Sequence, residues 1–167
     1  MTILDIPLIS RVRRNHGLEH ATINILSQRF PYQPLAGYSS PGGFWILGEV
    51  PTEELREAVI QALTRMHAGE RHLAIHANCG TNVVASGFVA GLLAWLGMAS
   101  ARSRREKVDR LPLVIALAML GFIISQPLGP AIQAHITTSG DPENLSIVEV
   151  FPVKFGRITL HRVVTQG

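Results

Sequence analysis

The chain has 167 residues, of which 47% are apolar and 6% aromatic, so it can bury the core of one domain, alone or beside a membrane element. Its formal net charge is +3, and the whole excess lies in ARSRREKVDR, residues 101–110, which argues against the spread basic face of a nucleic-acid-binding protein. The single cysteine, Cys79, excludes an internal disulfide bond and therefore a small secreted scaffold held together by disulfides.

The first part of the chain predicts two helices separated by a pair of strands. Apolar residues recur at helical spacing over residues 7–29, and Pro31 ends the pattern. The stretch LAGYSSPGGFWILGEV predicts a β-hairpin, because its Ser, Pro and Gly residues suit a turn and residues 44–50 suit a strand. Thr52 is the expected N-cap of the second helix, TEELREAVIQALTRMHAG, which has an acidic first turn and closes at Gly69.

Further strands are expected on both sides of the apolar middle of the chain. RHLAIHAN, residues 71–78, predicts a third short strand with His72 and His76 on one face. The C-terminal stretch SIVEVFPVKFGRITLHRVV, residues 146–164, alternates in hydropathy around a central Phe-Gly and predicts a second strand pair. The pattern as a whole indicates an α+β fold.

Two uncharged apolar segments, residues 83–101 and 111–133, interrupt this pattern. Each is long enough to cross the roughly 30 Å hydrocarbon core of a membrane as a helix. Because the connection between them is short, they are expected to form a hairpin whose basic loop, residues 101–110, lies among lipid headgroups. The alternative is a buried pair of helices inside a soluble domain, but a chain of this size has little else with which to cover them.

The hairpin divides the chain into three parts. We expect an α+β domain at residues 1–82, the transmembrane hairpin at residues 83–133 and C-terminal strands at residues 134–167. A hairpin returns the chain to the side from which it came, so the C-terminal strands can pack on the N-terminal domain. Gly87 and Gly91 are spaced for close packing between the two helices, and the prolines of the second segment predict a kink.

The stretch HGLEH, residues 16–20, carries the strongest chemical signal. On a helix, His16 and His20 lie on one face about 6 Å apart, so their imidazoles can bind one metal ion. Glu19 is offset by one residue, where its carboxylate can exchange a proton with a water molecule on that ion. H-x-x-E-H is the inverted form of a zinc-peptidase motif, and such a site needs a third protein ligand and keeps a fourth position open.

The candidates for the third ligand are Cys79, His72, His76, His135 and His161. Cys79 is favoured because NCGTN places it directly before a helix, whose first N–H groups stabilise a thiolate. His76 and His72 are expected to support a metal ligand or to contact the substrate. Other interpretations stay open: a solvated helix face at His16, an inert buried thiol at Cys79, and structural histidines elsewhere.

Three stretches together resemble the zinc enzyme family of S-ribosylhomocysteine lyase (LuxS): HGLEHATINIL, SSPGGFWILGEVPTEELREAVIQAL and NCGTN, within residues 13–82. The resemblance implies that His16, His20 and Cys79 bind one zinc ion. It also implies that Glu19 is the general acid/base and that the domain has the family's fold. We expect the C-terminal strands to take the place of the family's leading strands, as in a circular permutation. The chain differs in having no thiol in SSPGGFW, where the family has a second, catalytic cysteine.

The whole chain also resembles a family of bacterial membrane proteins without known function, through GLEHATINIL, GGFWILG, HANCGTN and SQPLGPAIQAHITTS. We therefore expect a multi-pass protein of the bacterial cytoplasmic (inner) membrane. A thiolate ligand is easier to keep reduced in the cytosol, which favours a zinc domain on the cytoplasmic side. The positive charge of loop 101–110 argues for the opposite orientation.

The predicted function is that of a membrane-anchored zinc metallohydrolase, peptidase-like or amidase-like, in which Glu19 moves a proton to and from a metal-activated water. The alternative is a non-catalytic membrane scaffold or accessory protein that zinc stabilises. A haem or redox protein fits less well, because the paired histidines share one helix face. The expected partners are the lipid bilayer, a small-molecule or peptide substrate and a second copy of the chain, and no nucleic acid is expected.

Overall fold

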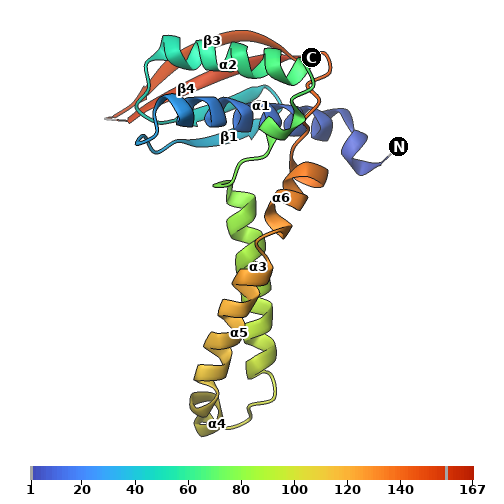
Figure 1. Cartoon of the computed structure of the whole chain (residues 1–167), viewed down its shortest axis with the longest axis vertical. Coiled ribbons are helices and arrows are strands. Elements are labelled where there is room, and N and C mark those ends of the chain that lie inside the picture. The colour runs from blue at the N-terminus through green and yellow to red at the C-terminus, as the bar shows by residue number, and fades with distance from the viewer. Residues whose placement is uncertain (1, 157) are drawn as a thin grey trace. The chain divides into compact units, whose positions relative to one another are not determined.

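The computed structural model describes residues 2–156 and 158–167, which divide into two compact units. Figure 1 shows the course of the chain through its helices and strands. The first unit consists of Met1–His76 and Gln133–Gly167, and the second consists of Ala77–Ile132. Helices and one antiparallel sheet make the fold a mixed α+β fold, which confirms the predicted class.

A four-stranded antiparallel sheet forms one layer of the first unit, in the order β1-β2-β4-β3. Its strands are Ala36–Ser40 (β1), Gly43–Leu47 (β2), Ser146–Phe155 (β3) and Ile158–Gln166 (β4). The predicted hairpin and the predicted C-terminal strand pair are both present. They are joined by the pairing of β2 with β4, in which Phe44 lies opposite Val163 and Ile46 opposite His161. Strands far apart in sequence therefore share one sheet.

Two helices form the other layer of the first unit (Figure 1). They are Pro7–Arg29 (α1) and Thr52–His67 (α2), close to the predicted bounds. Helix α1 packs against α2, β1 and β2, and α2 also packs against β3. Alternate residues of β2 and β4 point into the interface between the layers, as the two-residue period of a strand requires. The core includes Leu18, Leu26, Phe44, Ile46, Leu55, Val59 and Val163.

The predicted third strand is wrong. Residues 71–74 form a 3-10 helix, Arg71–Ala74 (η2), and the chain is extended only after it. The carbonyl oxygens of Leu73 and Ile75 each accept a hydrogen bond from the Asn24 side chain, at 3.0 Å. A side chain of α1 thus takes the acceptors that a neighbouring strand would have used.

Thr52 is the first residue of α2 and not its N-cap, which is Pro51. The Thr52 hydroxyl instead lies 3.1 Å from Nε2 of His161, which is 1% exposed on β4. Nδ1 of His161 has no hydrogen-bond partner among the residues that the structure describes. The imidazole is therefore buried with one polar contact, and this burial lowers its pKa.

The second unit is helical and contains a hairpin of two long helices (Figure 1). The helices are Gly80–Met98 (α3), Arg104–Asp109 (α4), Leu111–Ile124 (α5) and Leu128–Ile132 (α6). Helices α3 and α5 pack closely at Gly121, where an added Cβ would lie 2.9 Å from the Cα of Ala90. Gly87 and Gly91 would meet nothing within 4 Å, so the sequence prediction named the wrong glycines for this contact.

One helix, α3, is long and apolar enough to cross a membrane, judged by length and composition alone. A second span is obtained only when α5 and residues 128–137 are counted together across a bend of 48°. That segment ends in a π-helical turn, Gln133–Thr137 (η3), which belongs to the first unit. Of the two predicted membrane spans, the first is therefore one continuous helix, and the second would have to be a bent pair of helices.

We expect acid to destabilise the fold in part through His161. Burial lowers the pKa of its imidazole below the usual 6.5, so the unfolded chain takes up the proton first as the pH falls. The stabilising contribution of the neutral ring is complete above pH 6.5 and is lost as the pH falls from there towards the folded-state pKa. In chemical unfolding followed by circular dichroism, His161→Gln should lose less unfolding free energy than the wild type between about pH 7.5 and pH 5.

The control is His67→Gln, which changes an exposed side chain at the end of α2 and should keep the pH dependence of the wild type. An unchanged pH dependence in His161→Gln would contradict the prediction.

Candidate metal centre

Helix α1 brings the two histidines of the HGLEH stretch together. The ring centroids of His16 and His20 lie 4.3 Å apart in an edge-to-face arrangement. His16 is half-buried and His20 is 2% exposed. Gly17 between them leaves room for the backbone at Ser139, because an added Cβ would lie 2.0 Å from the carbonyl oxygen of that residue. The sequence therefore allows backbone to pass close to this face of the helix.

Backbone carbonyls fix which ring nitrogen of each histidine can bind a metal. His16 Nδ1 lies 2.9 Å from the carbonyl oxygen of Thr137, and His20 Nδ1 lies 2.8 Å from that of Ala74. A carbonyl oxygen only accepts hydrogen bonds, so in the neutral rings both Nδ1 atoms carry the hydrogen. The lone pair is then on Nε2 of each ring, and the bond at Nδ1 also increases its basicity as a ligand.

Cys79 completes a set of three possible ligands. It is 8% exposed and is the N-cap of α3, where its Sγ accepts a hydrogen bond from the Thr81 N–H at 3.4 Å. A helix N-terminus favours the thiolate form. One ligand atom from each of His16, His20 and Cys79 lies within 4.8 Å of the other two. A tetrahedral zinc ion with bonds of about 2.0–2.3 Å needs ligand atoms closer together than this limit.

Glu19 is 3% exposed, and it faces β1 rather than solvent. Its Oε2 accepts a short hydrogen bond from the Ser39 hydroxyl. The neighbouring Gly37 has no side chain to exclude it, because an added Cβ would lie 2.1 Å from Oε1 of Glu19. Strand β1 therefore supplies both a donor and the space for a carboxylate that can accept and return a proton.

His76 lies near this group, whereas His72 does not. The ring of His76 is 5.8 Å from the ring of His20, and its Nδ1 is 2.7 Å from Oδ1 of Asn24. The Gln133 side chain also bonds the backbone N–H and carbonyl of His76, at 2.9 and 3.1 Å. His72 is exposed on η2 and lines a separate cavity. The prediction that both histidines share one strand face fails because this segment is not a strand.

The other two candidate ligands lie elsewhere. His135 is exposed on η3, and only its carbonyl has a described role, as an acceptor for Arg13 at 3.3 Å. His161 is buried on β4 beside Thr52.

Sequence reasoning missed the residues that contact the candidate ligands, His76 and the Glu19 carboxylate, namely Asn24, Gly37, Ser39, Ala74 and Thr137. No residue type or spacing marks a backbone carbonyl as a partner for a histidine, and only the turn-rich SSPGG stretch pointed towards Ser39.

The chain is similar in sequence to one described protein family and to one bacterial protein. Residues 11–150 match the family described as "Domain of unknown function (DUF6391)". An uncharacterized protein of Picosynechococcus sp. (strain ATCC 27264 / PCC 7002 / PR-6) is 34% identical over 152 residues, which cover 83% of this chain and 71% of that protein. No solved structure matches the chain.

Gly37→Ala should displace the Glu19 carboxylate, since the new Cβ would overlap Oε1. Glu19 is buried, so its side chain has no solvent into which it can move without losing the Ser39 hydrogen bond. We expect a loss of about 1–3 kcal/mol in the free energy of unfolding, measured by chemical denaturation.

Gly42→Ala is the matched control in the same hairpin, because its Cβ would meet only Nη2 of Arg162, at 3.4 Å. Equal stabilities for the two variants would show that β1 does not constrain Glu19.

Proposed function

The chain belongs to the DUF6391 family, and we propose that it is a membrane-anchored zinc enzyme. In this proposal His16, His20 and Cys79 hold the ion, and Glu19 acts as general acid/base. The observation that carries the proposal is a group of three side chains typical of zinc sites, with ligand atoms within 4.8 Å of one another. The buried Glu19 carboxylate lies on the helix that carries the two histidines. The carbonyl partners of both histidines support it, because they leave the metal-binding lone pair on Nε2.

The reaction that best suits these residues is hydrolysis of an amide or a similar bond. A zinc ion with three protein ligands and an open fourth position would lower the pKa of a bound water to about 7. Glu19 would take a proton from that water as the C–O bond forms and would return it to the leaving nitrogen as the C–N bond breaks. Ser39 would orient the Glu19 carboxylate through their hydrogen bond.

We extend the proposal to the relationship with S-ribosylhomocysteine lyase. The pairing of β4 with β2 supports the idea that C-terminal strands replace the leading strands of that family. The SSPGG turn carries no thiol, so the second cysteine of the lyase has no counterpart here, and we propose hydrolysis in place of the lyase reaction.

A second candidate function is a non-catalytic, zinc-stabilised scaffold. The hydrogen bonds of His16 and His20 connect α1 to the backbone at Thr137 and at Ala74, so an ion on these rings would also tie distant chain segments together. A structural site needs no acid or base, whereas Glu19 is a buried carboxylate held by Ser39. That carboxylate is the reason for favouring the enzyme.

The second unit is proposed to be the membrane anchor. Only 11% of the most apolar window of α3 is buried, and large apolar side chains are exposed along α3 and α5. They include Val83, Phe88, Trp95, Leu113, Ile115, Met119 and Phe122. An exposed apolar surface of this extent suits lipid and not water. We propose the inner membrane of a bacterium, α3 with the bent α5 segment as a hairpin, and the zinc domain on the cytoplasmic side.

The full chain, purified in detergent, should contain about one zinc ion per molecule by elemental mass spectrometry. His16→Ala and Cys79→Ala should each lose most of this zinc to a moderate chelator. Glu19→Gln should keep it, because the carboxylate is not a ligand. His72→Ala, at an exposed residue, is the control that should behave as wild type.

Turnover then separates the two candidate functions. We expect zinc-loaded wild type to cleave members of a defined library of short peptides, read by mass spectrometry, and Glu19→Gln to lose about 100-fold or more of that rate. If wild type and Glu19→Gln both retain zinc, and both give the same products or none, the result would instead favour the scaffold. Zinc content that is unaffected by His16→Ala and Cys79→Ala would refute both candidates.

The anchor is tested by extraction of cell membranes with alkaline carbonate. Wild type should stay in the membrane pellet, because α3 is apolar on its exposed surface. A chain carrying Phe88→Arg and Trp95→Arg should be released in part, since each arginine costs about 2.5–3.5 kcal/mol within a membrane helix. Tyr32→Arg changes a side chain that is 97% exposed in the first unit and serves as control. Complete release of wild type would contradict the anchor.

A further inference from the structure

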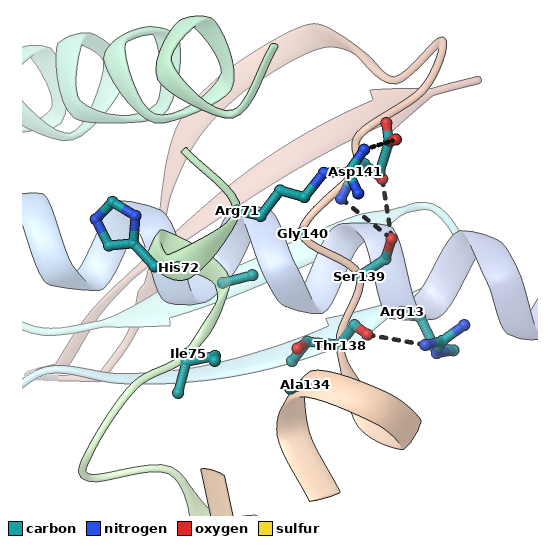
Figure 2. A pocket seen from close by; sticks show the side chains of 10 residues that line it. Arg13, Arg71, His72, Ile75, Ala134, Thr138, Ser139, Gly140 and Asp141 are labelled. Atoms are coloured by element: carbon teal, nitrogen blue, oxygen red, sulfur yellow. Dashed lines mark hydrogen bonds and ion pairs between the residues drawn. The ribbon is translucent and has the colours of Figure 1, made fainter. Parts of the chain in front are cut away.

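A cavity of about 340 Å³ with polar and apolar walls lies on the first unit, where η2 faces the backbone of residues 138–141. Figure 2 shows the Arg71 side chain directed at Asp141 and the His72 ring turned away from both. Arg13 of α1 closes another part of the wall. Two arginines and a single carboxylate therefore line the cavity, and its volume is that of a site for a small molecule.

The charges of this cavity are not balanced. Arg13 donates to the carbonyl oxygens of Ile136, His135 and Thr138, at 2.7, 3.3 and 3.0 Å, and forms no ion pair with any residue that the structure describes. Carbonyl oxygens hold the guanidinium in place without neutralising its charge. Hydrogen bonds from Thr2 lower the pKa of Asp5, and the charge of Arg13 adds to this effect, but Asp5 does not line the cavity. Arg71 forms an ion pair with Asp141 at 2.9 Å. Among the residues that line the cavity, the two arginines and the one carboxylate leave an excess of one positive charge.

The ion pair is also placed where a ligand can displace it. The side chains of Arg71 and Asp141 are 70% and 52% exposed, so their contact is screened by water and holds little free energy. The bond to Asp141 uses one terminal nitrogen of Arg71, and the other donors of its guanidinium have no partner among the described residues. They are available to a planar acceptor.

The backbone around the ion pair is held rigidly. Ser139 Oγ accepts from the Asp141 N–H and donates to the Asp141 carbonyl, and the Ser139 N–H donates to the carbonyl of Arg13 at 2.9 Å. Gly140 lies against Arg71, since an added Cβ would be 2.7 Å from the Cβ of that residue. A cavity whose wall is already ordered loses less entropy when it binds a ligand.

We propose that this cavity binds the carboxylate group of a small molecule or peptide end, with Arg71 as the main contact and Arg13 supplying positive charge. A single net positive charge and the planar fork of arginine match a monoanionic carboxylate better than a dianionic phosphate. Asp141 occupies Arg71 when the ligand is absent.

The cavity also shares a wall with the candidate metal centre. Ala74 lines it, and the carbonyl of the same residue accepts the hydrogen bond from His20. A substrate held here by its carboxylate would lie beside the HGLEH face of α1. The identification of this ligand as the substrate rests on the proposed function, whereas the binding of a carboxylate does not.

The test uses the zinc-free full chain in detergent, with N-acetylalanine and its methylamide as probes that differ only in the carboxylate. Binding is followed by saturation-transfer NMR titration. We expect the acid to bind about tenfold or more tightly than the amide, and Arg71→Gln to weaken acid binding by a similar factor. Asp141→Asn removes the competing carboxylate and should tighten binding about threefold. Its Oδ1 acceptor for the Glu143 N–H is kept, so the backbone turn should remain.

Arg56→Gln is the control, because this half-buried arginine of α2 donates to the Val150 carbonyl and does not line the cavity. Equal binding of acid and amide, unchanged binding in Arg71→Gln, or a weaker acid complex in Asp141→Asn would each overturn the proposal. Tighter binding of inorganic phosphate than of the acid would overturn the assignment to a carboxylate. Because the measurement is made without zinc, its outcome is independent of the metal centre.

Discussion

Two hydrogen bonds from histidine rings to backbone carbonyls determine what the HGLEH helix can do. His16 donates to the Thr137 carbonyl and His20 to the Ala74 carbonyl. The η3 segment and the η2 segment therefore both contact the face of α1 that carries the two histidines. These bonds set the tautomer of each ring and place the lone pair on Nε2. Without them the same two residues on the same helix would be free to rotate or to bind protons, and the neighbouring thiol would have no preorganised partners.

The environment of Glu19 follows from the same packing. Helix α1 lies against β1, so a residue one position from the His16–His20 face is buried beside the hairpin. A buried carboxylate is costly unless it is hydrogen-bonded, and Ser39 meets this requirement, while Gly37 supplies the space. A hydrogen-bonded acid beside a set of possible metal ligands is more than a stabilising ion requires, and it is why we prefer an enzyme to a scaffold.

Sequence patterns within a single segment predicted most of the helices and strands of the first unit. Both helices of the first unit, the SSPGG hairpin and the C-terminal strand pair follow from periodicity, turn residues and capping signals. The strand expected at RHLAIHAN was wrong, because Asn24, a residue 49 positions before Leu73, satisfies that backbone from α1. Spacing alone selected His16, Glu19 and His20 as candidates. Spacing could not select Ser39 or the carbonyls of Ala74 and Thr137, because these groups reach α1 only when distant segments pack on it. Nor could it distinguish His76, whose ring lies near that of His20, from the exposed His72.

The proposed function depends on one zinc coordination shell, and X-ray absorption at the zinc edge measures that shell directly. For the purified full chain, we predict a four-coordinate zinc spectrum with nitrogen scatterers at about 2.0 Å and one sulfur at about 2.3 Å. The sulfur contribution should vanish in Cys79→Ser. A shell of nitrogen and oxygen alone, with no sulfur in the wild type, would contradict the claim that Cys79 and the two histidines hold the same ion.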